Sequence, residues 1–320
     1  MIANWTAHMK IKSGFNDALW MTGGAAALLI FLFVILRLHS EKDTAAQLAF
    51  KARRVDLVGR MQLDLASASE AEKSAVLAVT DETSKALADQ ARAASEKVEQ
   101  ERRDIGELLM AGGTQGEREL LAQFTSAFVE FQRVDSDLLA LAVKNTNVKA
   151  YGLAFGPAAT AIKEMNTALA HLAAASANSP EAKTTVVLAL GAEIGALRIQ
   201  TLLPPHIAEE SDTKMDELEA LMRTDDNQVR KDLDGLAAQP QFSKNPDLAI
   251  ATARYAEFSS IRTRILALSR ENTNVRSLSI SLGQKRKVML VCQSALTALQ
   301  QAILAEPIAG SAYGTPVRPR

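Results

Sequence analysis

The sequence has few of the residues that build disulfide frameworks, aromatic clusters and tight turns. Its one cysteine, Cys292, excludes an intrachain disulfide, and its apolar neighbours indicate a small buried side chain. Aromatic residues make up only 5% of the 320 positions, and there are 16 glycines and 9 prolines. Together with 48% hydrophobic and 23% charged residues, this is the composition of helical or coiled-coil proteins.

The charge balance and the missing motifs exclude several classes of function. The formal net charge of −1 lacks the basic surplus of a nucleic-acid-binding protein, so we expect no nucleic acid partner. The four histidines are scattered, and no Cys-x-x-Cys-His or Glu-x-x-His motif occurs. No Gly-rich phosphate loop, nucleophile elbow or zinc signature occurs either. We expect no enzyme activity, no metal site and no cofactor; noncovalent haem binding stays open.

One long uncharged run lies near the N-terminus. Leu19 to Leu36 spans 18 residues, which at about 1.5 Å per residue is about long enough to cross a bilayer core of about 30 Å. No small-x-small cleavage site follows it, so we predict an uncleaved transmembrane helix over 18–37. It follows a segment over 1–17, whose cytoplasmic location is implied by the resemblance described below. Basic residues flank the run on both sides, so charge alone leaves the orientation open.

After the membrane segment, apolar residues recur at helical spacing almost throughout. Leu121, Phe124, Phe128, Phe131, Leu138 and Ala142 follow steps of three, four and seven, as in a bundle helix. Three breaks are predicted inside helical stretches, at Gly156-Pro157, Pro204-Pro205 and Gly283. The helices expected from these patterns cover 45–79, 82–111, 121–142, 157–177, 181–203, 209–238, 248–268 and a last stretch that ends near 305.

An internal repeat is the strongest pattern in the chain. A shift of 127 residues lays 121–172 over 248–299 without a gap, and 16 of the 52 aligned positions are identical. The longest match is Asn145-Thr146-Asn147-Val148 over Asn272-Thr273-Asn274-Val275. The repeat predicts an all-α fold with two tandem antiparallel four-helix bundles, over 41–178 and 181–305, and a flexible tail over 306–320.

The first bundle resembles the four-helix-bundle sensory domain of methyl-accepting chemotaxis receptors. The resemblance is carried by the helix from Arg53-Arg54-Val55-Asp56-Leu57 to Ser74, the segment from Ala71-Glu72-Lys73 to Lys97, and the apolar pattern from Leu120 to Ala142 with the Asn145–Val148 turn and Gly156-Pro157. It covers 41–178 well and 181–305 more weakly. It implies an extracytoplasmic bundle that binds small molecules or accessory proteins, and hence a periplasmic location for both bundles.

The chain also departs from those receptors. It has no second membrane span, linker domain or signalling hairpin, so we expect it to act through a partner. In amino-acid-sensing members, several arginines on the first helix hold the ligand carboxylate. Arg54 matches one of them, but Gly59 and Leu63 stand where the next two would be. Amino-acid specificity is therefore not implied.

Polar residues beside the predicted cores are the candidate ligand-binding residues. Arg54 and Arg60 each offer a bidentate guanidinium for an anionic ligand at a dimer interface, or are simply solvated or ion-paired within their helix. Arg60 recurs as Arg198, either as a hydrogen-bond anchor or as a pocket wall. The repeated amides either bind a ligand or close and cap helix ends: Asn145, Asn147, Asn272 and Asn274.

Two functions fit these observations. The first is a sensory or ligand-binding module, anchored in the lipid of a bacterial inner membrane by a single span, with a small-molecule ligand and a membrane or periplasmic protein partner. The second is a structural or scaffolding protein of a membrane-associated complex without a small ligand. Homodimer formation is compatible with both.

Overall fold

The computed structural model describes residue 31 and residues 44–308, and every regular element in those residues is a helix. Phe31 is helical, but the expected cytoplasmic segment, the rest of the expected membrane span and residues 309–320 lie outside the described residues. The chain forms two compact units. Unit 1 comprises 1–62, 100–122 and 295–320, and unit 2 comprises 63–99 and 123–294.

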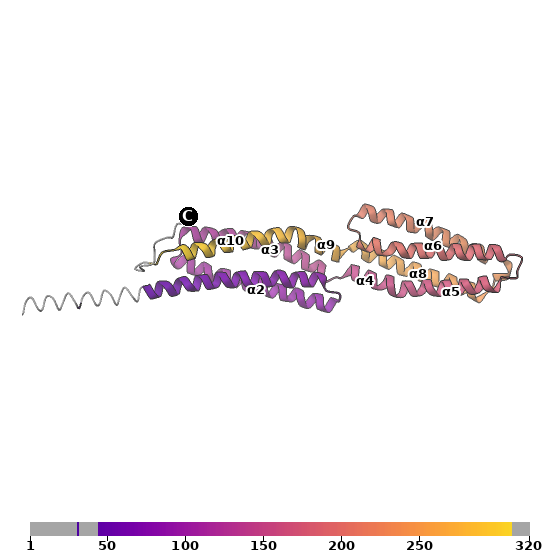
Figure 1. The fold of residues 1–320 in the computed structure, drawn as a ribbon, viewed down its shortest axis with the longest axis horizontal. Helices are drawn as coiled ribbons and strands as arrows, with labels where there is room; N and C mark the ends of the chain where they lie inside the picture. Colours follow the sequence, from indigo (N-terminus) through magenta and orange to yellow (C-terminus); the bar gives the residue numbers. More distant parts are fainter. Residues whose placement is uncertain (1–30, 32–43, 309–320) are drawn as a thin grey trace, which may run out of the picture. The chain divides into compact units, whose positions relative to one another are not determined.

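The described helices follow one another with short connections (Figure 1). The first covers residues 44–77 and is called helix 44–77. The α-helices that follow are α2 (Asp81–Gly112), α3 (Gln115–Ala142), α4 (Thr146–Leu153), α5 (Ala159–Ala175), α6 (Ala182–Ala208), α7 (Asp212–Ala237), α8 (Pro246–Glu271), α9 (Thr273–Ile280) and α10 (Arg286–Ala305), with π turns η1 (Ala154–Ala158) and η3 (Ser281–Lys285) and the 3-10 turn η2 (Pro240–Phe242).

Unit 1 brings together segments of helix 44–77, α2, α3 and α10. The side chain of Arg54 is buried and donates to Glu117 at 2.8 Å, and it also pairs with Glu306. The Lys51 ammonium donates to the carbonyl oxygen of Glu306 at 2.6 Å. Glu306, the first residue of the expected flexible tail, is therefore held by two cations, and the prediction was wrong at that residue.

In unit 2, the other ends of these helices pack around a core of small and aliphatic side chains. The Ser84 hydroxyl of α2 donates to the carbonyl oxygens of Ala75 and Ala142, at 2.9 and 3.1 Å, and so joins helix 44–77 to α3. The buried cluster around it draws on helix 44–77, α2 and α3, with Ile280 of α9 packed against it. We call this set of helices, closed by α10, the first bundle.

The second bundle lies wholly in unit 2 and consists of α5, α6, α7 and α8, with α4 packed on α8 (Figure 1). One continuous core runs from Ala150 in α4 to Ile265 in α8, and it includes Leu169 of α5 and Ile199 of α6. The apolar patterns that the sequence indicated in 121–142 and 248–268 are buried in these cores, except Leu268, which is partly buried.

The expected tandem division at 178–181 is wrong, because it cuts through this core. Helix α5 packs on α8 and α6 and contributes its buried side chains to the core of the second bundle. The fourth helix of the first bundle is α10. In η3, which leads directly into α10, Lys285 pairs with Asp135 of α3 and Gln284 donates to Glu130 of α3 at 3.0 Å. The second bundle is thus inserted between the third and fourth helices of the first.

The second bundle follows α3 directly because the chain does not reverse its direction between α3 and α5. Asn145 is the one left-handed residue there, with φ of 50°, and α4 begins directly after it. Gly156 and Pro157, expected to break the helix, lie in η1, because a π turn accommodates the missing proline N–H without ending the helix. Asn272 and η3 repeat the same design between α8 and α10. Each repeat therefore starts in one bundle and ends in the other.

Helix α6 also differs from expectation. It continues through Pro204 and Pro205 to Ala208, where the sequence predicted a kink or break near 203. It and the stretch Pro246–Ala305 are long and apolar enough, by length and composition alone, to cross a membrane. Both stretches contribute side chains to the second-bundle core, so this test is weak evidence for a span.

Two glycines set the close approach of α6 to α7. A Cβ at Gly191 would meet the carboxylate of Asp232, and one at Gly195 would lie 2.6 Å from Cγ2 of Val229. Val229 is fully buried and β-branched, so its χ1 has little freedom to move away. A Cβ at position 195 would therefore push α6 and α7 apart, whereas the Asp232 carboxylate opposite Gly191 is the end of a side chain that can rotate.

We predict that Gly195→Ala lowers the free energy of unfolding by about 1–3 kcal/mol, the usual cost of overpacking a core, less the gain in helix propensity. Thermal and urea unfolding of the full chain would measure it. The matched control is Gly152→Ala in α4, where no atom lies within 4 Å of the added Cβ. Equal stability of the two variants would contradict the proposed close packing.

Candidate functional site

The three arginines expected at a ligand site lie in different surroundings. Arg54 is buried in unit 1, where Glu117 and Glu306 neutralise it and its guanidinium lies 4.9 Å from the Phe50 ring centre. Arg60 is exposed and pairs with Asp56 one turn away at 2.6 Å. Arg198 is exposed, 3.9 Å from Asp225. Arg54 therefore joins helices of unit 1, and the other two arginines are solvated. None of the three is among the residues that line the pocket described below.

The repeated asparagines meet each other across the two repeats. We call residues 145–147 and 272–274 the Asn-Thr-Asn crossing. The amide N–H of Thr146 donates to Oγ1 of Thr273 at 3.2 Å, and that of Thr273 donates to Oγ1 of Thr146 at 3.1 Å. Residues 127 apart thus exchange equivalent hydrogen bonds, which gives the crossing a local twofold relation.

The asparagine side chains complete the same pattern. Oδ1 of Asn274 accepts from the N–H of Asn147, and Oδ1 of Asn147 accepts from the N–H of Asn274. The Nδ2 group of Asn147 donates to Asn272, and that of Asn274 donates to Asn145. These bonds satisfy N–H groups in the first turns of α4 and α9, which have no partner within their own helices. The asparagine side chains therefore cap the helix start of the opposite repeat, and their amides are not free to bind a ligand.

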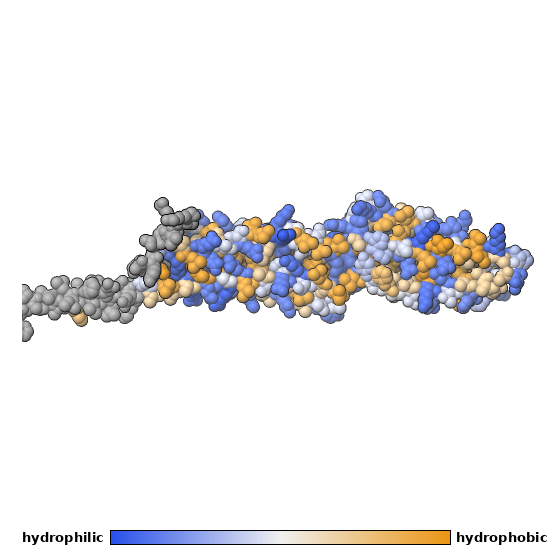
Figure 2. All heavy atoms as spheres, viewed as in Figure 1, coloured by the Kyte–Doolittle hydropathy of each residue, from blue (hydrophilic) through white to orange (hydrophobic). Residues whose placement is uncertain are grey.

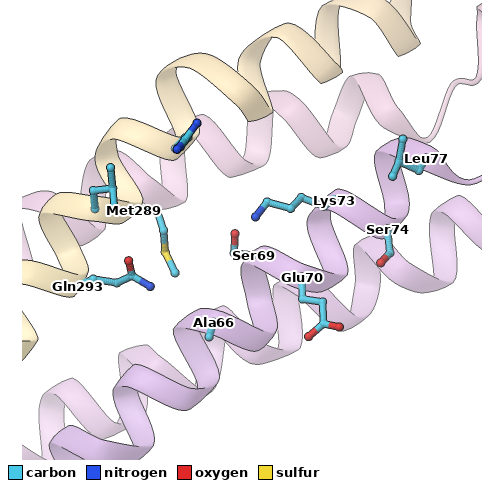
Figure 3. Close-up of a pocket in the computed structure, with 10 residues that line it drawn as sticks. Ala66, Ser69, Glu70, Lys73, Ser74, Leu77, Met289 and Gln293 are labelled. Carbon is cyan, nitrogen blue, oxygen red and sulfur yellow. The ribbon is translucent and has the colours of Figure 1, made fainter.

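An open pocket of about 420 Å³ lies in unit 2 between helix 44–77 and α10 (Figure 3). We call it the α10 groove. Helix 44–77 contributes Ser69, Glu70 and Lys73, and α10 contributes Arg286 and Gln293. Its apolar wall is formed by Ala66, Leu77, Met289 and Leu290, and Ser74 completes the lining.

The side chains of the α10 groove suit a small anion. In Figure 3 the ammonium of Lys73, the hydroxyl of Ser69 and the amide of Gln293 point into the space between the helices. The carboxylate of Glu70 points away from it. One cation on each helix, Lys73 and Arg286, together with hydroxyl and amide donors, can hold a carboxylate, while the Met289 side chain contacts an apolar portion.

A buried cluster of charged side chains lies on the core side of the same two helices. Glu72 and Lys285, the sequence neighbours of Lys73 and Arg286, are 0% and 1% exposed. The Lys285 ammonium pairs with Asp135 of α3 and lies 3.3 Å from the centre of the Phe131 ring. Neither carboxylate oxygen of Glu72 has a hydrogen-bond partner within the part of the chain that the structure describes.

Burial decides the ionisation of this cluster. It raises the pKa of Glu72, which the charge of Lys285 only partly opposes. Burial also lowers the pKa of Lys285, against the opposing charge of Asp135. The pKa of the Cys292 thiol is raised to about 12 by burial, so it stays protonated and unreactive, as the sequence indicated.

The second bundle holds a chain of hydrogen bonds that resembles a hydrolase triad. His206 lies 2.8 Å from Ser269 through Nδ1 and 3.0 Å from Glu219 through Nε2. Ser269 is fully buried, and its hydroxyl also lies 2.9 Å from the backbone carbonyl of His206. No described pocket reaches it, so we interpret the chain as a structural tie between α6, α7 and α8.

Sequence reasoning missed the α10 groove and the buried cluster. Lys73 and Arg286 are 213 positions apart, and each looks like an ordinary charge on a helix surface. The available signal was Lys285, a charge at a position where the apolar pattern of a core helix requires an inward side chain. Because the fourth helix of the first bundle was assigned to 157–177, α10 was not expected beside helix 44–77.

Comparison with known families agrees with the resemblance found in the sequence. Residues 56–185 match the family model described as "Four helix bundle sensory module for signal transduction". No curated protein and no solved structure matched the chain. The match covers four consecutive helical stretches, and the last of them, α4 to α5, is the one that the structure assigns to the second bundle.

We predict that Glu72→Gln changes how stability depends on pH. Because the folded-state pKa of Glu72 is raised above its ordinary value of 4.5, the folded chain binds more protons between those two values, and the parent loses stability as pH rises through that window. The variant lacks this loss, so its unfolding midpoint exceeds the parent's at neutral pH, and the two converge toward pH 4.5.

Thermal unfolding of the full chain from pH 4.5 to neutral pH would measure the difference. The control is Glu96→Gln, the same substitution at an exposed position of α2 in unit 2. Parallel midpoint curves for Glu72→Gln and the parent would show that the Glu72 pKa is not raised.

We predict that Asn147→Ala lowers the free energy of unfolding by about 1–3 kcal/mol or more, since it leaves the N–H of Asn274 and the carbonyl of Ile207 without a partner. Asn227→Ala, at an exposed position of α7, is the matched control. Urea unfolding would distinguish the two, and an unchanged Asn147→Ala midpoint would exclude the capping role.

Proposed function

We propose that the protein is a membrane-anchored sensory module that binds a small organic anion in the α10 groove and passes the signal to a protein partner. The observation that carries the proposal is the α10 groove itself, with one cation on each of two helices that are far apart in sequence. The match of residues 56–185 to a sensory module for signal transduction supports the sensory class.

The charges favour an anionic ligand over a neutral one. Lys73 and Arg286 line the groove from opposite helices, and Glu70, the acidic residue among the lining residues, turns its carboxylate away. Both cations are exposed in the unliganded protein, so a bound carboxylate would replace water rather than a protein partner. The chemistry is shared by many metabolites with one or two carboxylates, and we do not assign a single compound.

The mechanism follows from the neighbours of the two cations. An anion held by both Lys73 and Arg286 favours a smaller separation of helix 44–77 and α10. Each of these residues is adjacent to a member of the buried cluster, Glu72 or Lys285, where the low dielectric makes Coulomb energies sensitive to distance. The cluster would therefore distinguish two helix packings, and the ligand shifts their populations by its difference in affinity.

Location and partner are further parts of the proposal. Helix 44–77 follows the predicted span over 18–37 in the sequence, so a shift of this helix would reach an inner-membrane partner, with both bundles in the periplasm. The alternative is a scaffold without a small ligand. Exposed apolar side chains on several helices favour that alternative and keep it open.

We predict that the full chain in detergent shows a saturable rise in thermal midpoint with small mono- and dicarboxylates, but not with the corresponding amides. At one hundred times its dissociation constant, a ligand specific for the folded state adds about 2.7 kcal/mol. Lys73→Gln and Arg286→Gln should remove the rise, while Lys287→Gln, an exposed lysine on α10 outside the groove, should keep it.

Two results would overturn the proposal. A flat response to the carboxylate panel would favour the scaffold, and a rise that persists in both Lys73→Gln and Arg286→Gln would place the ligand elsewhere.

A further inference from the structure

Helix α6 is apolar on two opposite faces. Its inner face, with Ala189, Ala192, Ala196 and Ile199, is buried in the second-bundle core. Its outer face carries Val187, Leu190, Ile194 and Leu197, which are between 40% and 61% exposed. Figure 2 shows apolar atoms gathered over α6 in this view. A helix that is hydrophobic all round is normally covered on both sides.

The exposed residues have the spacing of a coiled coil. The steps from Val187 to Leu190, Ile194 and Leu197 are three, four and three, which places β-branched residues at a and leucines at d of a heptad. That combination favours parallel two-stranded coiled coils. Most buried residues of α6 occupy the heptad positions c and f, with Gly195 at b, and none of them lies at a or d, so the exposed seam is free to receive a partner helix.

The charges beside the seam select the partner and its direction. In this register Glu193 is a g residue and Arg198 is the e residue five positions later. In a parallel pair of identical helices, g of one chain lies next to e of the other, so Glu193 would meet Arg198 of a second copy twice. In an antiparallel pair, g lies opposite g and e opposite e, which would bring like charges together.

We propose that the outer face of α6 is a homodimer interface, in which two copies of α6 form a short parallel coiled coil. Arg198 is available for this contact, because it is 69% exposed and its ion pair with Asp225 of α7 is long, at 3.9 Å. Glu193 is partly exposed on the other side of the seam. No residue of α6 lines the α10 groove, so the test of this interface is independent of the proposed ligand.

The test is disulfide crosslinking of the full chain in the membranes of expressing cells. Val187→Cys and Leu197→Cys lie at opposite ends of the seam, and each should crosslink to itself under mild oxidation. Leu221→Cys on α7 is the matched control, since Leu221 is 54% exposed and lies outside the seam. The native Cys292 is fully buried and gives no background.

Charge-reversal variants provide a second, independent test of the homodimer. Glu193→Arg or Arg198→Glu alone should reduce crosslinking through Leu197→Cys by about tenfold, a factor that corresponds to about 1.4 kcal/mol, because both ion pairs become repulsive. The double variant restores the pairs and should restore the crosslink. Far-UV circular dichroism would verify that each variant folds.

The outcomes separate the proposal from its rivals. Crosslinking at 187 and 197 no stronger than at 221 would overturn it. A disulfide that forms only between a 187 variant and a 197 variant would show an antiparallel pair and would also overturn it. Crosslinking that is unchanged in the charge-reversal variants, or that joins the chain only to another protein, would also overturn the proposal and assign the seam to a different partner.

Discussion

The two-bundle arrangement depends on the hydrogen bonds of the Asn-Thr-Asn crossing. There the chain passes between bundles twice, and both passages interrupt a helix at a single left-handed asparagine. A helix start exposes amide groups that need acceptors, and at this depth water supplies few of them. Each repeat provides the acceptors for the N–H groups of the other. These N–H groups of one repeat would therefore lack hydrogen-bond acceptors without the other repeat.

This exchange explains why the second bundle is inserted in the sequence between the third and fourth helices of the first. Helix α3 continues into α5 and α8 continues into α10, so each repeat starts in one bundle and ends in the other. The repeats are related as in a domain swap within one chain. A tandem arrangement would need a reversal between α3 and α5, and one αL residue followed by a π turn does not reverse a helix.

The same exchange creates the α10 groove. It brings Arg286 and Gln293 from the second repeat beside Lys73 and Ser69 from the start of the chain. It also places Lys285 opposite Asp135 and near Glu72, where three ionisable groups share an apolar interior. Such a cluster contributes little stability, because desolvation offsets much of the ion-pair energy. Its value to a sensory module would lie in its sensitivity to small helix shifts.

Sequence patterns determined the helical class, most helix boundaries and the residues of each apolar face. Phe124, Phe128 and Phe131 were expected in a core and are buried, because local spacing alone decides which face of a helix is apolar. The resemblance to a sensory bundle was likewise readable from residues 41–178, and the family match over 56–185 confirms it. The sequence did not show which helices pack against one another. A leucine such as Leu169 of α5 is equally suited to the core of either bundle. Only the tertiary structure decided that α10 rather than α5 closes the first bundle, because the deciding hydrogen bonds join residues 127 positions apart.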